Sequence, residues 1–183
     1  MLRPRPVSAL PYPQAVALYA LAISQAMKLD RSTKLVIKDA CSFLRKNRIG
    51  PAEGHLSRHT AAHCLDVNET VLYYREHWDG PGGVPGAVGG EMIPLTSRIL
   101  AVADLWARLT AAGSPELTHA ESLKQLESRA GLHFDPTVVA AVAKIVEAER
   151  LGLGGDAAYE PRLHRIPLPR LVAKLGGLAG EAA

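Results

Sequence analysis

The chain has 183 residues, of which 48% are apolar and 21% are charged, and its formal net charge is +3. This balance excludes a disordered chain, and so small a net charge gives no support for a nucleic-acid partner. Aromatic residues make up only 5%, so the core must rest on Ala, Leu, Val and Ile. No window approaches the roughly 18–20 consecutive apolar residues of a membrane span.

The N-terminus and the cysteines indicate a cytoplasmic protein. The first residues carry charge but lead into prolines rather than into an apolar run, so a signal peptide is not expected. Only Cys41 and Cys64 are present, and they lie in different segments. Two such cysteines do not form a disulfide framework, and a reducing cytoplasm is expected.

Three helices are predicted in the first half of the chain. Four prolines make residues 1–13 an extended arm. Asp30 or Ser32 can cap the second helix by accepting backbone N–H bonds. The expected helices are Gln14–Lys28, a second helix that ends at Ile49-Gly50-Pro51, and a third from Leu56 to about Glu76.

The second half begins with a loop. The segment Asp79–Gly90 holds six Gly and two Pro in twelve positions, which is typical of a loop rather than of a regular element. A fourth helix is expected from about Thr96 to Gly113. The fifth helix is expected to begin at Thr118, which has capping-box spacing with Glu121, and to end at Gly131. The sixth helix is expected to begin at Asp135-Pro136 and to run to about Arg150.

These elements predict an all-α fold, a compact bundle of about six helices over residues 14–150 with the Gly/Pro-rich loop before the fourth helix. Residues 151–183 form a C-terminal extension rich in Gly, Pro and Ala, with a possible short helix near Leu168–Leu175.

Three histidines, His55, His59 and His63, recur every four residues along one helical face. Adjacent pairs can chelate an ion. All three cannot bind the same ion, because eight residues of helix rise about 12 Å and Zn–N bonds are only about 2.1 Å long. The alternative is a partly exposed histidine face that titrates near neutrality.

Asp104 is a second candidate. It lies nearly opposite the apolar stripe formed by Ile99, Val102, Trp106 and Leu109, among small apolar neighbours. It is either solvated or covered by another element, and a covered carboxylate needs a cation or a metal as its partner.

The Gly-rich loop and the basic residues allow further alternatives. Backbone N–H groups of such a loop can bind an anion, but Glu76, Asp79 and Glu91 flank it and disfavour a phosphate. The simple alternative is a long connector. Basic residues on the second helix and in the tail lack the interleaved aromatics of a base-stacking surface. No motif for a covalent nucleophile is present.

Many residues of the chain match, in the same order, the characteristic sequence pattern of a known family. The matching residues are Glu76, Trp78, Asp79, Gly80, Gly90, Glu91, Ile93-Pro94-Leu95, Arg98–Asp104, Leu109-Thr110, Gly131 and Phe134-Asp135-Pro136. Gly83-Val84-Pro85 stands where Gly-Tyr-Pro is expected, after an apparent one-residue insertion. The chain therefore resembles the HD-GYP family, bacterial metal-dependent phosphodiesterases of cyclic di-GMP, and the resemblance implies their helical fold.

The resemblance also implies that most metal ligands are lost. The family has an adjacent His-His pair where this chain has Tyr74 and Arg75. The family's His-Asp dipeptide corresponds to a position near Phe43-Leu44, and neither of these residues can bind a metal. The first helix has neither the expected His nor the expected Glu. Only His59 and Asp104 match ligands, with His55 as a further possibility. Gly113 and Glu116 replace the Arg and Lys that hold the substrate phosphates.

We therefore predict a catalytically degenerate HD-GYP-like signalling module that acts through protein contacts. No cofactor is expected, and if there is one it is a single divalent Zn, Fe or Mn. The expected partner is a diguanylate-cyclase-type domain or a second copy of the chain, and cyclic di-GMP binding is not favoured. The alternatives are a residual metal-dependent phosphohydrolase and a non-catalytic cyclic di-GMP receptor. The expected interaction surface is the loop with its neighbours, namely an exposed Trp78, Gly82, Gly83, Val84, Pro85 and Arg98.

Overall fold

The computed structural model describes residues 12–45, 60–80, 82, 88–110 and 117–153. These residues form an all-helical bundle, as predicted, and no strand occurs among them beyond two isolated bridges. The helices are α1 (Tyr12–Ala26), α2 (Arg31–Arg45), α3 (Ala61–Tyr73), α4 (Leu95–Thr110), α5 (His119–Glu127) and α6 (Pro136–Leu153), with a 3-10 turn, η2 (Gly90–Met92), before α4.

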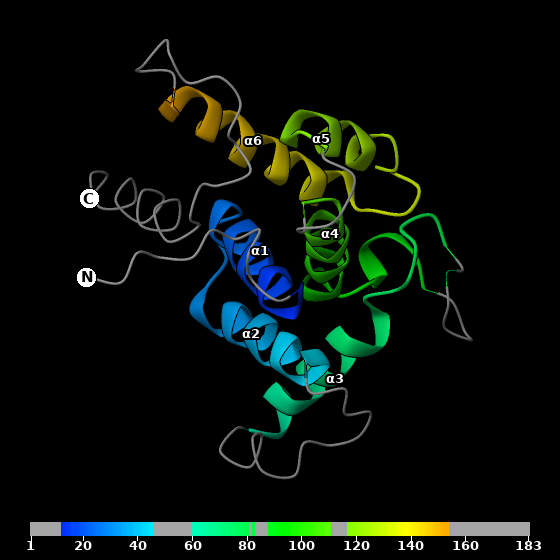
Figure 1. The fold of residues 1–183 in the computed structure, drawn as a ribbon. Helices are drawn as coiled ribbons and strands as arrows, with labels where there is room; N and C mark the ends of the chain where they lie inside the picture. Colours follow the sequence, from blue (N-terminus) through cyan, green and yellow to red (C-terminus); the bar gives the residue numbers. More distant parts are fainter. Residues whose placement is uncertain (1–11, 46–59, 81, 83–87, 111–116, 154–183) are drawn as a thin grey trace, which may run out of the picture.

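Helix α4 is the centre of the bundle (Figure 1). It packs most extensively on α1 and also contacts α2, α3, α5 and α6. Its predicted stripe of Ile99, Val102 and Trp106 is buried, and so are Leu100 and Ala107 on the opposite side. In Figure 1, α2 and α3 lie on one side of the α1–α4 pair and α5 and α6 on the other.

The N-terminal arm is shorter than predicted. Helix α1 begins at Tyr12, so Pro13 lies in its first turn. Proline is tolerated there because the first N–H groups of a helix have no intrahelical acceptor. The prolines therefore do not extend the arm through residue 13. Residues 1–11 lie outside the described part of the chain.

The predicted start and end of the third helix were also wrong. Thr60 is extended and caps α3, because its hydroxyl oxygen accepts the His63 N–H at 3.3 Å. The helix ends at Tyr73 rather than at Glu76, since the chain turns there and His77 and Gly80 form a bridge. The predicted C-terminal ends of the second and fourth helices, at residues 49 and 113, lie outside the described residues, as does the predicted helix in the tail.

Local capping signals placed the later helices correctly. Thr118 and Glu121 form the predicted capping box at the start of α5. Gly131 follows α5 with a φ of 80°, a left-handed conformation that favours glycine. Asp135 accepts the Thr137 N–H at 2.7 Å and caps α6, which begins at Pro136 and ends at Leu153, three residues beyond the predicted end.

Replacing Thr118 by alanine is expected to lower the free energy of unfolding by about 1 kcal/mol, because the Thr118 hydroxyl no longer accepts the Glu121 N–H or donates to the Glu121 carboxylate. Urea denaturation followed by circular dichroism measures the change. Replacing the exposed, unpartnered Ala120 by serine on the same helix is the control and should change little. An equal loss in both variants would contradict the capping argument.

None of the helices in the described part of the chain is long and apolar enough to span a membrane.

Candidate functional site

The Asp104 carboxylate is covered by α1 and engaged on both oxygens. The Tyr12 hydroxyl donates to Oδ1, and Arg108 Nη2 donates to Oδ2 at 2.5 Å. Only 21% of the Asp104 side chain is exposed, whereas 60% of the Arg108 side chain is exposed. Burial, with help from the hydrogen bond to Asp104, raises the pKa of the Tyr12 phenol far above its ordinary value, so this group remains a donor.

Tyr74 and Arg75 lie beside this carboxylate. Arg75 Nε donates to the Tyr74 hydroxyl oxygen at 2.9 Å, and the guanidinium lies 5.4 Å from the centre of the Tyr74 ring. The hydrogen bond to Tyr74 raises the pKa of Arg75, and the charge of Asp104 adds to the effect. We call Tyr12, Tyr74, Arg75, Asp104 and Arg108 the Tyr–Arg cluster.

The Tyr–Arg cluster does not fit a metal centre that holds two or three ions. Both Asp104 oxygens are engaged by other donors, and two arginines place positive charge where a divalent cation would have to bind. Nowhere in residues 12–45, 60–80, 82, 88–110 or 117–153 do three His, Cys, Asp or Glu side chains gather as ligands. His55 and His59 lie outside the described residues, so their role stays a prediction.

The third histidine of the predicted face has a protein partner. His63 Nε2 lies 2.9 Å from Asp39 Oδ2 on α2, and the two side chains are 12% and 5% exposed. Sequence reasoning missed Asp39. Its position on the buried side of helix α2, between Ile37 and Ala40, was the signal that an acid there needed a partner.

The beginning and the end of the Gly-rich loop are tied to the rest of the bundle by backbone bonds. The Trp78 and Asp79 N–H groups donate to the carbonyls of His133 and Leu132, at 3.2 and 2.8 Å. At the other end of the loop, the Gly90 N–H donates to the Trp78 carbonyl at 2.7 Å. The α5–α6 connection therefore holds the base of the loop.

Trp78 is partly buried, not exposed as predicted. The Arg98 guanidinium lies 5.6 Å from its ring centre, and Arg98 Nη1 donates to the buried Asp135 at 2.6 Å. Both residues therefore serve to join the loop, α4 and α6. Gly82 also packs tightly, because an added Cβ would lie 2.7 Å from the His77 backbone nitrogen. Gly83, Val84 and Pro85 lie outside the described residues.

A cavity of about 10 Å³ lies under the loop, between Trp78, Glu76 and Arg98. A cavity of this size holds about one water and no nucleotide. Arg98 Nε is buried without a hydrogen-bond partner in the described structure, and Glu76 is buried and accepts the Gly82 N–H at 3.1 Å. The cavity is therefore part of the packing under the loop.

Two histidine rings lie against each other, tilted by 49°, where the loop meets the α5–α6 connection. The ring centres of His77 and His133 are 4.2 Å apart. Burial, together with the nearby charges of His77 and Arg129, lowers the pKa of His133, and Asp79 opposes this effect. The folded state therefore binds a proton at His133 less readily than the unfolded state does.

Protonation of His133 is expected to weaken the fold. Stability should be full above the ordinary histidine pKa and should decrease as the pH falls through it toward the lowered pKa of the folded state. Urea denaturation at pH 7.5 and 5.5 should show a smaller decrease for His133→Gln than for the parent chain. An equal decrease in the two proteins would show that His133 does not contribute.

The helical bundle, with the loop anchored between α3 and α4, is an HD-domain-like helical fold. The sequence of residues 53–138 matches the HD domain family. A solved structure titled as a cyclic GMP-AMP specific phosphodiesterase of Vibrio cholerae (V-cGAP3) has the same fold, with a TM-score of 0.52 at 18% identity over 91% of this chain and 54% of that one.

Two relatives from Vibrio cholerae are similar in sequence. A cyclic di-GMP phosphodiesterase is 36% identical over 98 residues, which cover 52% of this chain and 19% of that protein. The 3'3'-cGAMP-specific phosphodiesterase 3 is 39% identical over 100 residues, which cover 55% and 20%. The chain spans about a fifth of the length of these curated relatives. The chain is therefore similar to HD-domain, HD-GYP-like proteins, as its sequence motifs predicted.

Proposed function

We propose that this chain is a catalytically degenerate HD-GYP-like regulatory module of bacterial signalling that acts through protein–protein contact. The observation that supports the proposal is that both carboxylate oxygens of Asp104 are hydrogen-bonded to side chains of the chain. These oxygens accept hydrogen bonds from Tyr12 and Arg108, so the carboxylate that matches a family metal ligand is already neutralised by protein groups. In-line hydrolysis assisted by two metal ions needs such carboxylates for the ions.

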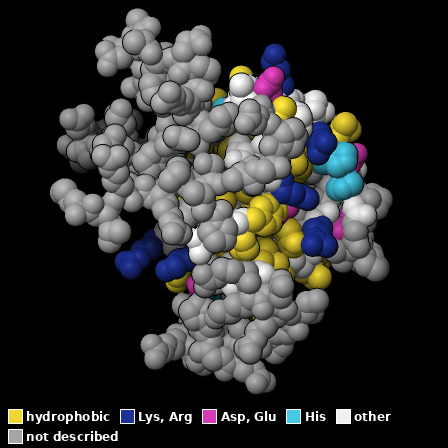
Figure 2. Space-filling view, viewed as in Figure 1, with side chains coloured by type: hydrophobic (Ala, Val, Ile, Leu, Met, Phe, Trp, Pro, Cys, Tyr) yellow, Lys and Arg dark blue, Asp and Glu magenta, His cyan; other side chains and the backbone are white. Residues whose placement is uncertain are grey.

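The charge around Asp104 supports the same proposal. Arg75 stands where the family resemblance expects a histidine, and it lies within electrostatic reach of Asp104. Two arginines around one acid leave a net positive site, which repels a divalent cation. Figure 2 shows Lys and Arg side chains at the border of an area of hydrophobic side chains. An apolar area with a polar rim is typical of surfaces that bind other proteins.

The proposal is tested by measuring whether the Gly-rich loop is needed to bind a partner protein. The 183-residue chain is mixed with a purified diguanylate-cyclase-type domain, and complex formation is measured by calorimetry. Replacing Val84 and Pro85 by serine should abolish binding without changing the circular dichroism spectrum. Gly82 must be kept, because it packs against the backbone of residues 75–77. Unchanged binding by the serine variant would overturn the role of the loop.

The alternative function is a residual metal-dependent phosphohydrolase, and the names of the Vibrio cholerae relatives favour it. His59 and Asp104, with His55, would then hold a single Zn, Fe or Mn ion. Elemental analysis of protein purified without a metal-affinity tag decides between the two. The main proposal expects metal well below one ion per chain, whereas a stoichiometric ion together with hydrolysis of cyclic di-GMP would favour the alternative.

A non-catalytic cyclic di-GMP receptor is the remaining alternative. Gly113 and Glu116 stand where the family carries the Arg and Lys that hold the phosphates. Calorimetry with the dinucleotide is expected to give no binding heat. Saturable binding at one site per chain would establish the receptor instead.

A further inference from the structure

The outer face of α3 carries exposed leucines and acids. Leu65 and Leu72 are 62% and 52% exposed, and their spacing of seven residues places them about 10 Å apart along one side of the helix. Glu69 lies between them and Asp66 lies beside them, both exposed. Helix α3 contains no Lys or Arg. Its outer face is therefore apolar and acidic.

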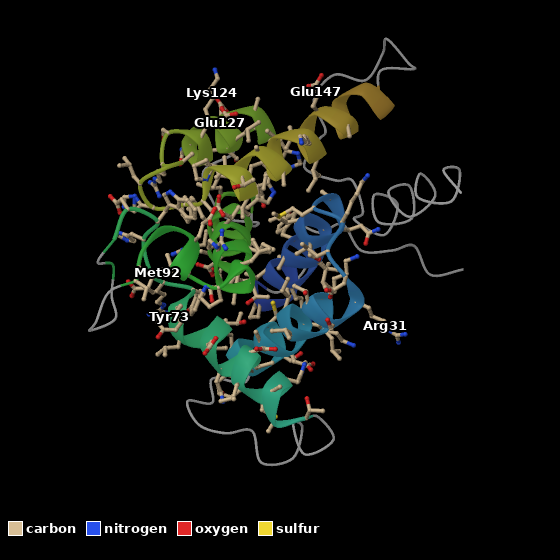
Figure 3. The ribbon with its side chains drawn as sticks, turned by 180° about the vertical axis from the view of Figure 1, so that it is seen from behind. Arg31, Tyr73, Met92, Lys124, Glu127 and Glu147 are labelled. Carbon is tan, nitrogen blue, oxygen red and sulfur yellow. The ribbon has the colours of Figure 1, made fainter. Side chains whose placement is uncertain are left out.

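The neighbouring helix α2 carries the opposite charge. Arg31, Leu35 and Lys38 are exposed at positions i, i+4 and i+7, so they lie on one side of the helix. Figure 3 shows Arg31 pointing away from the bundle. The acid of α2, Asp39, is buried against His63 and adds no charge to this face. The outer face of α2 is therefore apolar and basic.

The charged side chains on these two faces are unpaired in the part of the chain that the structure describes. Across the residues that the structure describes, Arg31, Lys38, Asp66 and Glu69 form no ion pair. Exposed apolar side chains that line up on one side of a helix and are rimmed by charged residues form a patch of the kind that marks an interaction surface. The opposite charges of the two faces indicate what fits each of them.

We propose that two copies of this chain associate, with the outer face of α2 in each copy lying on the outer face of α3 in the other. Helices α2 and α3 pack side by side, so a single two-fold axis can form both contacts at once. Leu35 of one copy then meets Leu65 or Leu72 of the other, and Arg31 and Lys38 face Asp66 and Glu69. This inference rests on the proposed function, because self-association is one form of the proposed protein contact.

Sedimentation equilibrium of the 183-residue chain tests the proposal. The parent chain should form a dimer, and the double variant Leu65→Ala, Leu72→Ala should dissociate at least about tenfold more readily. Both leucines are exposed in the single chain, so their loss should leave its folding intact. Leu132→Ala is the matched control, since Leu132 is 51% exposed but lies in the α5–α6 connection, away from both faces.

Charge exchange sharpens the test. Lys38→Glu and Glu69→Lys should each weaken the dimer several-fold, because each places like charges opposite one another, and the combined variant should restore it. A parent chain that stays monomeric at about 100 μM, or a combined variant no better than the single ones, overturns the inference. A monomeric chain that still binds a cyclase domain through its loop would overturn it and leave the proposed function standing.

Discussion

Replacing Asp135 by alanine is expected to lower the free energy of unfolding by about 3–5 kcal/mol. The Asp135 side chain is fully buried and accepts hydrogen bonds from Arg98 Nη1 at 2.6 Å and from the Thr137 N–H at 2.7 Å. Its removal uncaps α6 and leaves the charge of Arg98, which is only 15% exposed, without its counter-ion. Urea denaturation monitored by circular dichroism measures the loss.

Glu127→Ala is the matched control, because Glu127 is exposed on α5, away from the proposed dimer faces, and forms no ion pair in the described part of the chain. It should cost less than about 0.5 kcal/mol. Burial alone would raise the pKa of Asp135, but the hydrogen bonds from Thr137 and Arg98 outweigh it and hold that pKa below its ordinary value. The Asp135 contribution should therefore persist at neutral pH and disappear only as the pH falls through this lowered pKa. Similar losses in the two variants would contradict the argument.

Replacing Trp106 by alanine should cost about 3–5 kcal/mol, because it removes the largest side chain at the centre of the bundle. Trp106 is 4% exposed on α4. Its ring meets Tyr19 of α1 edge-on with centres 6.5 Å apart, and it lies 5.8 Å from the His119 ring at the start of α5. A single substitution therefore opens a cavity that three helices line.

Thermal and urea unfolding should both record this loss for Trp106→Ala. Leu132→Ala, at a position 51% exposed, should change the free energy of unfolding by less than about 0.5 kcal/mol. A small effect at Trp106 would mean that the surrounding side chains collapse into the space, which the packing of α1 against α4 argues against.

Features that depend on a few neighbouring residues could be predicted from the sequence. The capping box of Thr118 and Glu121 and the Asp135-Pro136 start of α6 are formed by groups within three positions of one another. The apolar stripe of α4 follows from helical periodicity in the same way. Prolines are found both in extended segments and in the first turn of a helix. The prediction chose the extended segment for Pro13, which lies in the first turn of α1.

Features that join distant segments could not be predicted. The Tyr12 hydroxyl reaches Asp104 across 92 positions of sequence, and His63 meets Asp39 across 24. The sequence indicated that Asp104 needed a partner if covered, but not that α1 would cover it and supply a phenol. Trp78 was expected to be exposed beside the Gly-rich loop, whereas Arg98 and the α5–α6 connection lie against it.

The anchoring of the Gly-rich loop has an evolutionary consequence. The Gly90 N–H bonds to the Trp78 carbonyl, and an added Cβ at Gly89 would lie 3.1 Å from the backbone of Gly80, so the two ends of the loop close on each other. With both ends fixed by backbone contacts, residues can be gained or lost between them at little cost to the bundle. The one-residue insertion relative to the HD-GYP pattern falls in this closed segment. The loop can therefore diverge in sequence and length while the helices below it remain unchanged.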